Sequence, residues 1–126
     1  MTIIEAVNKV DNLVPNTFLL IDKINWLSQI DARITREILD THIPYPCTEL
    51  VPFHPYTEET PEDTELIAPV PYDELYLYFL QMQIDYYNGE YDKYNNSSQM
   101  FNNAYKEYRN FYNKTHIPKS ARNRYF

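Results

Sequence analysis

The chain has 126 residues, including one cysteine, one glycine, nine prolines and thirteen tyrosines, and its formal net charge is -7 at pH 7. This length fits one domain, and a hydrophobic content of 44% excludes an intrinsically disordered chain, which has too few large apolar side chains to offset the entropy of ordering. The negative charge argues against non-specific binding to nucleic acid, which needs clustered Lys and Arg, and a single glycine excludes the glycine-rich phosphate-binding loops.

Cys47 is the single cysteine, so no internal disulfide can form, and the sequence begins without the basic leader and apolar core of a signal peptide. We therefore expect a protein made in the cytoplasm. No run of about eighteen uncharged apolar residues occurs, because Pro15, Asp22 and Lys23 interrupt the most apolar stretch. We expect no membrane span.

Two amphipathic helices are predicted at the start of the chain, over residues 3–14 and 18–42. Thr2 is placed to cap the first helix, Pro15 ends it, and Asn16 or Thr17 is placed to cap the second. Apolar residues recur at helical spacing at Ile3, Val7, Val10 and Val14, and then at Leu20, Ile24, Leu27, Ile30, Ile34 and Ile38. Asp31 falls within the second apolar stripe, an exception that the helical period does not explain.

Residues 43–71 contain seven prolines, which remove backbone donors and disfavour helix, so this segment is predicted to be a non-helical arm. It is either irregular or a small β-hairpin with extended pieces at residues 50–53 and 65–68. The arm is acidic, and its candidate contact residues are Glu58, Glu59, Glu62, Asp63 and Glu65. A long non-helical insertion in a helical domain is typical of a segment that makes contacts.

Two further helices are predicted over residues 72–94 and 98–113. A seam of apolar residues steps by three and four through Leu77, Leu80, Ile84, Tyr87, Tyr91 and Tyr94, and then through Phe101, Tyr105, Tyr108 and Tyr112. One unbroken helix would be about 63 Å long, too long for a compact domain of this size. The sequence YNNSSQ favours turns, and Asn96 followed by Gln99 resembles a capping box, so we place the junction near residues 95–98. A single kinked helix remains the alternative.

Several aromatic residues of this region lie off the seam, namely Tyr76, Tyr78, Phe79, Tyr86 and Phe111. A helix that is apolar over much of its circumference is either central in the fold or pressed against another subunit. We therefore name Tyr78, Phe79 and Tyr86 as candidate subunit-interface residues.

The helical core is thus expected to comprise residues 1–42 and 72–113 of a single all-α domain, with the arm at 43–71 and an extended basic tail at 114–126. The tail is either a frayed terminus or a segment that docks on a neighbouring subunit. Its candidate docking residues are Lys119, Arg122, Arg124, Tyr125 and Phe126.

No catalytic, metal or cofactor motif is found in the sequence, so we expect neither an enzyme nor a cofactor. His42, Cys47 and His54 stand five and seven residues apart in a proline-rich loop, without the close pairs of a structural zinc site. A thiol nucleophile formed by Cys47 and His54 is a minor hypothesis, because nothing in the sequence places an orienting group beside them.

Three pieces of the sequence, in this order, resemble a known family: DKINWLSQID, APVPYDELY, and YNNSSQMFNNAY followed by YNKTHIP. The similarity covers roughly residues 5–120, and it is to the head-tail connector (adaptor or head-completion) proteins of long-tailed bacteriophages and prophages of Gram-positive bacteria. Residues 44–70 do not map onto a common pattern of that family.

The resemblance implies a structural virion protein that is made in the host cytoplasm and assembles into a ring of about twelve copies in the virion neck. The ring would dock on the portal, extend the DNA channel without specific DNA binding, and carry the next neck or tail protein. Residues Lys119 to Phe126 would reach the portal. From the residues alone, the alternative is a small acidic cytoplasmic regulator or inhibitor that binds a protein through the arm as a mimic of nucleic acid.

Overall fold

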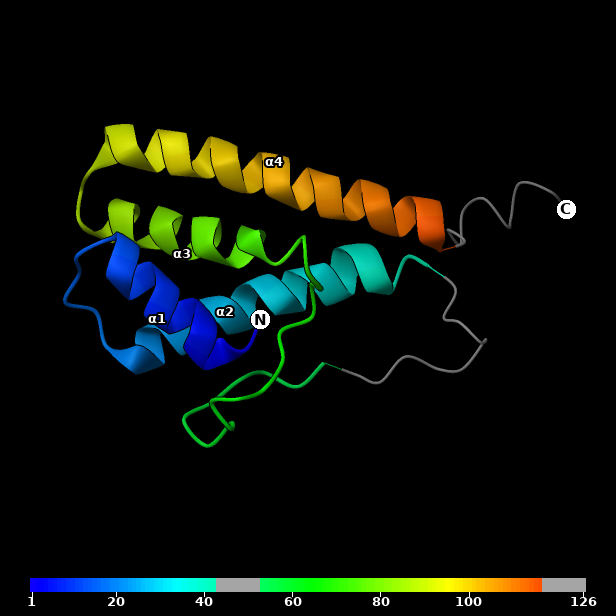
Figure 1. Ribbon diagram of the computed structural model, residues 1–126, viewed down its shortest axis with the longest axis horizontal. Helices are drawn as coiled ribbons and strands as arrows, with labels where there is room; N and C mark the ends of the chain where they lie inside the picture. The colour runs from blue at the N-terminus through cyan, green and yellow to red at the C-terminus, as the bar shows by residue number, and fades with distance from the viewer. Residues whose placement is uncertain (43–52, 117–126) are drawn as a thin grey trace, which may run out of the picture.

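The computed structural model describes residues 1–42 and 53–116, and in them the chain is built from helices and one irregular arm (Figure 1). The helices are α1 (Ile3–Leu13), α2 (Leu20–Ile34), the π-helical turn η1 (Thr35–Leu39), α3 (Glu74–Tyr87) and α4 (Tyr91–Thr115). The predicted all-α fold is confirmed, since the described residues form no strand beyond one isolated β-bridge.

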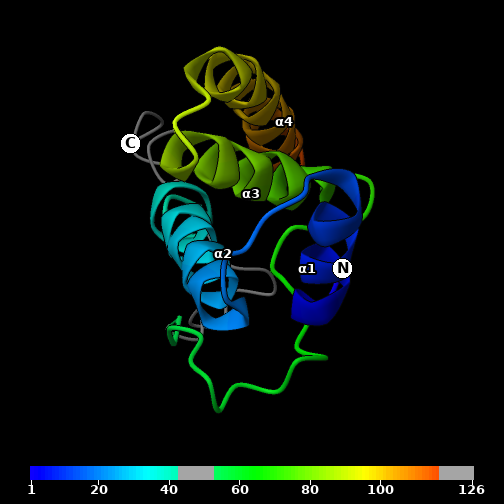
Figure 2. The ribbon, with the colours of Figure 1, turned by 90° about the vertical axis from the view of Figure 1, so that its left-hand side faces the viewer.

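Helix α3 lies in the centre of the bundle, with α4 on one side and α1 and α2 on the other (Figures 1 and 2). This central position explains why α3 is apolar over much of its circumference. The core is drawn from all four helices and consists mainly of Ile3, Val7, Val10, Ile24, Leu27, Ile30, Ile34, Ile38, Leu75, Tyr76, Leu80, Ile84, Phe101, Tyr105 and Tyr108. The helical stripes predicted for the first two helices therefore face the core, except where they meet: Val14 is half-buried and Leu20 is 38% exposed.

The start of α1 matches its prediction, because the Thr2 side chain accepts a hydrogen bond from the Glu5 amide. The predicted cap of α2 is wrong. That helix begins at Leu20 with no side-chain cap, and Asn16 instead bonds within the preceding loop, where its side chain accepts from the Phe18 amide. At the other end, the helical conformation continues beyond α2 as the η1 turn to Leu39.

The junction between the last two helices lies at residues 88–90, so its predicted position near residues 95–98 is wrong. Gly89 has φ of 75°, a left-handed conformation that glycine adopts without steric cost. The Gly89 amide donates to the Tyr86 carbonyl and the Glu90 amide to the Asp85 carbonyl, which is the hydrogen-bond pattern of a Schellman helix end. Asn96 and Gln99 lie within α4 and form no capping box.

The described part of the arm is irregular, and its second half pairs with the start of the chain. Thr2 and Glu65 form an antiparallel bridge, while the Ile3 and Ile4 amides donate to the Thr64 and Glu62 carbonyls at 3.0 and 2.9 Å. The predicted extended piece at residues 65–68 thus finds its partner at the N-terminal end of the chain. Of its predicted hairpin partner at residues 50–53, all but the last residue lie outside the described part.

Candidate interaction surfaces

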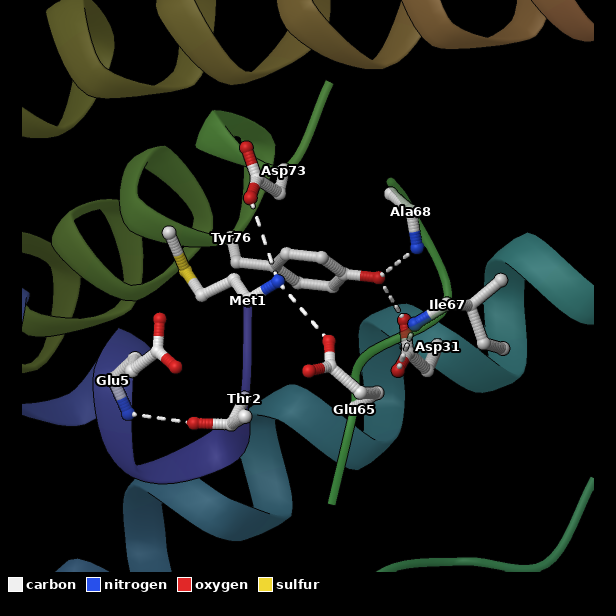
Figure 3. A network of polar contacts seen from close by, with 9 residues as sticks. All are labelled: Met1, Thr2, Glu5, Asp31, Glu65, Ile67, Ala68, Asp73 and Tyr76. Carbon is white, nitrogen blue, oxygen red and sulfur yellow. Dashed lines mark hydrogen bonds and ion pairs between the residues drawn. The ribbon is translucent and has the colours of Figure 1, made fainter. Parts of the chain in front are cut away.

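A buried cluster around Asp31 joins the arm to the helices (Figure 3). The Asp31 carboxylate accepts hydrogen bonds from the Tyr76 hydroxyl at 2.5 Å, the Tyr56 hydroxyl at 2.5 Å and the Ile67 amide at 3.3 Å. The Tyr76 hydroxyl also accepts from the Ala68 amide at 2.7 Å. This cluster explains the polar residue in the apolar stripe of α2, because Asp31 binds a backbone segment and two tyrosines that lie far away in sequence.

The electrostatics of this cluster keep the tyrosines as donors. Burial raises the pKa of Asp31, and the hydrogen bonds from Tyr56 and Tyr76 lower it in part without cancelling the effect of burial. Burial, followed by the charge of Asp31, raises the pKa of Tyr76 well above the usual tyrosine value, and the same two causes raise the pKa of Tyr56. Both hydroxyls therefore stay protonated at neutral pH, and they hold the arm against α2 and α3.

The acidic arm residues Glu58, Glu59, Glu62, Asp63 and Glu65 are all exposed. They belong to residues 57–65, which we call the acidic loop. Two hydrogen bonds fix the tip of this loop, from the Thr57 amide to the Thr60 hydroxyl at 2.8 Å and from the Glu59 amide to the Thr57 hydroxyl at 3.2 Å. At the base of the loop, the Met1 amino group lies 3.3 Å from the Glu65 carboxylate and 3.5 Å from that of Asp73 (Figure 3). The arm thus presents its carboxylates to solvent from a defined backbone.

The three candidate interface residues of α3 differ in how deeply they are buried. Phe79 lies in the core, where its ring centroid is 5.2 Å from that of Phe101, so its burial needs no second subunit. Tyr78 is half-buried beside α4. Tyr86 is 50% exposed at the C-terminal end of α3.

Tyr86 belongs to an exposed apolar surface at one end of the bundle, which we call the aromatic end and define as Leu13, Leu19, Leu20, Tyr86, Tyr87 and Tyr91. These residues lie where α1 ends, α2 begins and α3 turns into α4, at the left of Figure 1. Tyr87 and Tyr91 are 60% and 64% exposed, so their predicted place in the buried seam is wrong. Tyr91 lies beyond the turn at Gly89, where the helical period is interrupted, and Tyr87 is the last residue of α3.

The aromatic end is ordered by ring contacts. Tyr87 stacks on Trp26 with a centroid distance of 5.8 Å, and Phe18 meets Trp26 edge-on at 5.5 Å. Tyr86 contacts the edges of Tyr87 and Tyr91 at 5.2 and 6.5 Å. Contacts of this kind favour particular ring orientations, so the end presents a defined apolar surface.

Another candidate surface is a groove between the start of α3 and the middle of α4. It has a volume of about 260 Å³, and it is lined by Pro71, Tyr72, Glu74 and Tyr78 on one side and by Met100, Asn103, Ala104 and Glu107 on the other. Tyr72 is held in place by stacking on Phe111 with a centroid distance of 4.7 Å. We call this surface the α3/α4 groove.

The predicted docking residues Lys119, Arg122, Arg124, Tyr125 and Phe126 lie outside the described residues, as does Cys47. His54 is exposed, whereas His42 is buried with Nε2 2.7 Å from the Asn113 side-chain oxygen. In residues 1–42 and 53–116, no three His, Cys, Asp or Glu side chains are grouped so that they could hold a metal ion.

None of the helices in the described part of the chain combines the length and the apolar character needed to cross a membrane. Comparisons of the chain with protein-family models, with curated proteins and with solved structures yield no match.

Proposed function

We propose that this chain is a structural subunit of the head-tail connector ring of a long-tailed bacteriophage or prophage. In this role it docks on the portal in the virion neck, extends the DNA channel and carries the next neck or tail protein. The sequence resemblance motivates the proposal, and the aromatic end is the structural observation that supports it.

The aromatic end suits contact with another protein surface. Exposed apolar residues that gather on one part of a surface mark interaction sites, and tyrosines are enriched at the centres of such interfaces. In this chain they lie at one end of the bundle, where α1 ends, α2 begins and α3 turns into α4. In a ring, this surface would meet a different surface of the neighbouring copy, and such a head-to-tail contact closes when the rotation between neighbours is suitable.

The exposed arm carboxylates agree with a role beside moving DNA. Phosphates are repelled by carboxylates, so a channel protein with a net charge of -7 would not retain DNA as it passes. In this role the twelve or so copies would act as a guide and a platform.

The test is co-expression with the portal protein, followed by electron microscopy of the purified complex. The double substitution Tyr87→Ser and Tyr91→Ser removes apolar area from the aromatic end, and we expect it to abolish portal-bound rings while far-UV circular dichroism stays unchanged. Val70→Ser is the matched control, because Val70 is an apolar residue of the arm that is 75% exposed and lies away from that end. Portal-bound rings of normal occupancy formed by the double variant would contradict this use of the surface.

A second candidate function is favoured by one observation, the fixed backbone of the acidic loop. Its exposed carboxylates suit a regulator that mimics nucleic acid and occupies a basic site on one target protein. Replacing Glu58, Glu59 and Glu62 by Gln separates the two functions, because a regulator loses its target while a connector subunit retains its rings.

A further inference from the structure

The α3/α4 groove combines an apolar floor with two carboxylates. The rings of Tyr72 and Tyr78 and the side chain of Met100 form the apolar part, and Glu74 and Glu107 stand on opposite sides. Both carboxylates are exposed, and neither forms an ion pair within the described part of the chain. The groove therefore places two exposed carboxylates beside aromatic rings.

The ligand chemistry that fits such a groove is a peptide with arginine and aromatic side chains. A guanidinium group pairs with carboxylates and also stacks on tyrosine rings, which a lysine ammonium does less well. An apolar ring of the ligand would cover Met100 and Tyr78. A neutral or acidic peptide has no matching group for Glu74 and Glu107.

A segment of this composition follows α4 in the same chain. Residues 117–126 have the sequence IPKSARNRYF, with three cations, two aromatic rings and no acid. Glu107 lies nine residues before His116 on α4, which is about 14 Å at the helical rise of ~1.5 Å per residue. Six extended residues beyond His116 span about 20 Å, so Arg122 can reach the level of Glu107 after a reversal of the chain.

We propose that the α3/α4 groove binds residues 119–126 of the same chain, with a guanidinium group between Glu74 and Glu107 and an aromatic ring over Met100. The tether raises the local concentration of the segment to the order of mM, so even a weak contact is occupied. A second copy offers the same residues without this advantage. The inference stands independently of the connector function, although in a connector the groove would hold the segment until the portal takes it.

Disulfide trapping in the full chain tests the proposal. In a Cys47→Ser background, one cysteine replaces Asn123 and a second replaces Asn103, which lines the groove. The matched control places the second cysteine at Asn102, which is also exposed but points about 100° away around α4. Cross-linking is followed over time under mild oxidation at low protein concentration, on gels with and without reductant.

We expect the Asn103 pair to form an intramolecular disulfide at least tenfold faster than the Asn102 pair. The double substitution Glu74→Gln and Glu107→Gln should slow disulfide formation by the Asn103 pair at least threefold, because it removes the two charges that attract the guanidinium group. Salt at 1 M should have the same effect, because it screens charge pairing between exposed groups. Equal rates for the two pairs would overturn the proposal. Disulfide-linked dimers in place of the intramolecular product would overturn it in favour of a second copy as the occupant. Neither result depends on whether portal-bound rings form.

Discussion

Replacing Tyr76 by Phe removes a single buried oxygen that joins the arm to two helices. The Tyr76 hydroxyl donates to Asp31 at 2.5 Å and accepts from the Ala68 amide at 2.7 Å, and both Tyr76 and Ala68 are completely buried. Without the hydroxyl, the Ala68 N–H has no partner, which costs about 1–3 kcal/mol, and a bond to a charged group worth about 1.5–3 kcal/mol is lost. We expect Tyr76→Phe to lower the free energy of unfolding by about 3–5 kcal/mol, a large part of the stability of a small domain.

Tyr56→Phe is the matched control for this substitution. The Tyr56 hydroxyl also donates to Asp31 at 2.5 Å, but its ring is half-buried, and the amide of Tyr56 keeps its own bond to the Ser28 hydroxyl. Because water can replace a hydroxyl at a half-exposed site, we expect a loss of only about 1 kcal/mol.

The assay is urea unfolding followed by far-UV circular dichroism and by the fluorescence of Trp26, the single tryptophan. Hydrogen exchange gives a local readout, since the Ala68 amide should lose protection in Tyr76→Phe and retain it in Tyr56→Phe. If Tyr76→Phe costs no more than Tyr56→Phe, the cluster does not connect the arm to the core in the way described.

Three further outcomes are expected. Gly89→Ala should lower the free energy of unfolding in urea by about 1 kcal/mol. Although no atom lies within 4 Å of the added carbon, φ of 75° strains any residue that has a side chain. Unchanged stability would contradict the helix end described at Gly89. The raised pKa of Asp31 means that its contribution is greatest below the usual value of 3.8 and is lost as pH rises through the raised value. Wild-type protein should therefore lose stability relative to Asp31→Asn as pH rises above about 4, and a constant difference up to pH 8 would refute this. Phe79→Ala should lower the free energy of unfolding by about 3–5 kcal/mol, and Tyr86→Ala should lower it by at most about 0.5 kcal/mol. If urea unfolding gives the reverse order, Phe79 is not in the core and Tyr86 is not exposed as described.

The helical periods of the first half of the chain predict the core faces of α1 and α2 correctly except at Leu20, because local spacing sets the face of a helix but not where that face extends beyond its neighbours. The junction between α3 and α4 lies at residues 88–90, and not near residues 95–98 as predicted, for a physical reason. The Asn and Ser residues near position 96 have low helix propensity, but tertiary contacts outweigh it, as where the Ser97 hydroxyl donates to the Asp85 carboxylate at 2.8 Å. The signal that mattered was Gly89, the residue that tolerates the left-handed conformation of a helix end.

The aromatic end and the Asp31 cluster can be predicted only in part from the sequence. The sequence predicts Tyr86 as an interface candidate, but Leu13 and Tyr91 join it through the packing of three helices, which no local pattern encodes. Asp31 is an exception to the apolar stripe that the sequence shows, yet its partners Tyr56 and Tyr76 lie 25 and 45 residues away in the chain. Polar clusters formed by such distant residues depend on the completed fold.

The pairing of the arm with the start of the chain has a practical consequence for engineering. Residues 62–66 accept or donate backbone hydrogen bonds to residues 1–4, so cutting out the acidic loop would also remove the partners of the first turn of α1. The tip at residues 58–60 forms hydrogen bonds only within residues 57–60 among the described residues and its carboxylates face solvent, which makes it a suitable position for attaching a fluorophore. A label placed there would report on assembly without loosening the bundle.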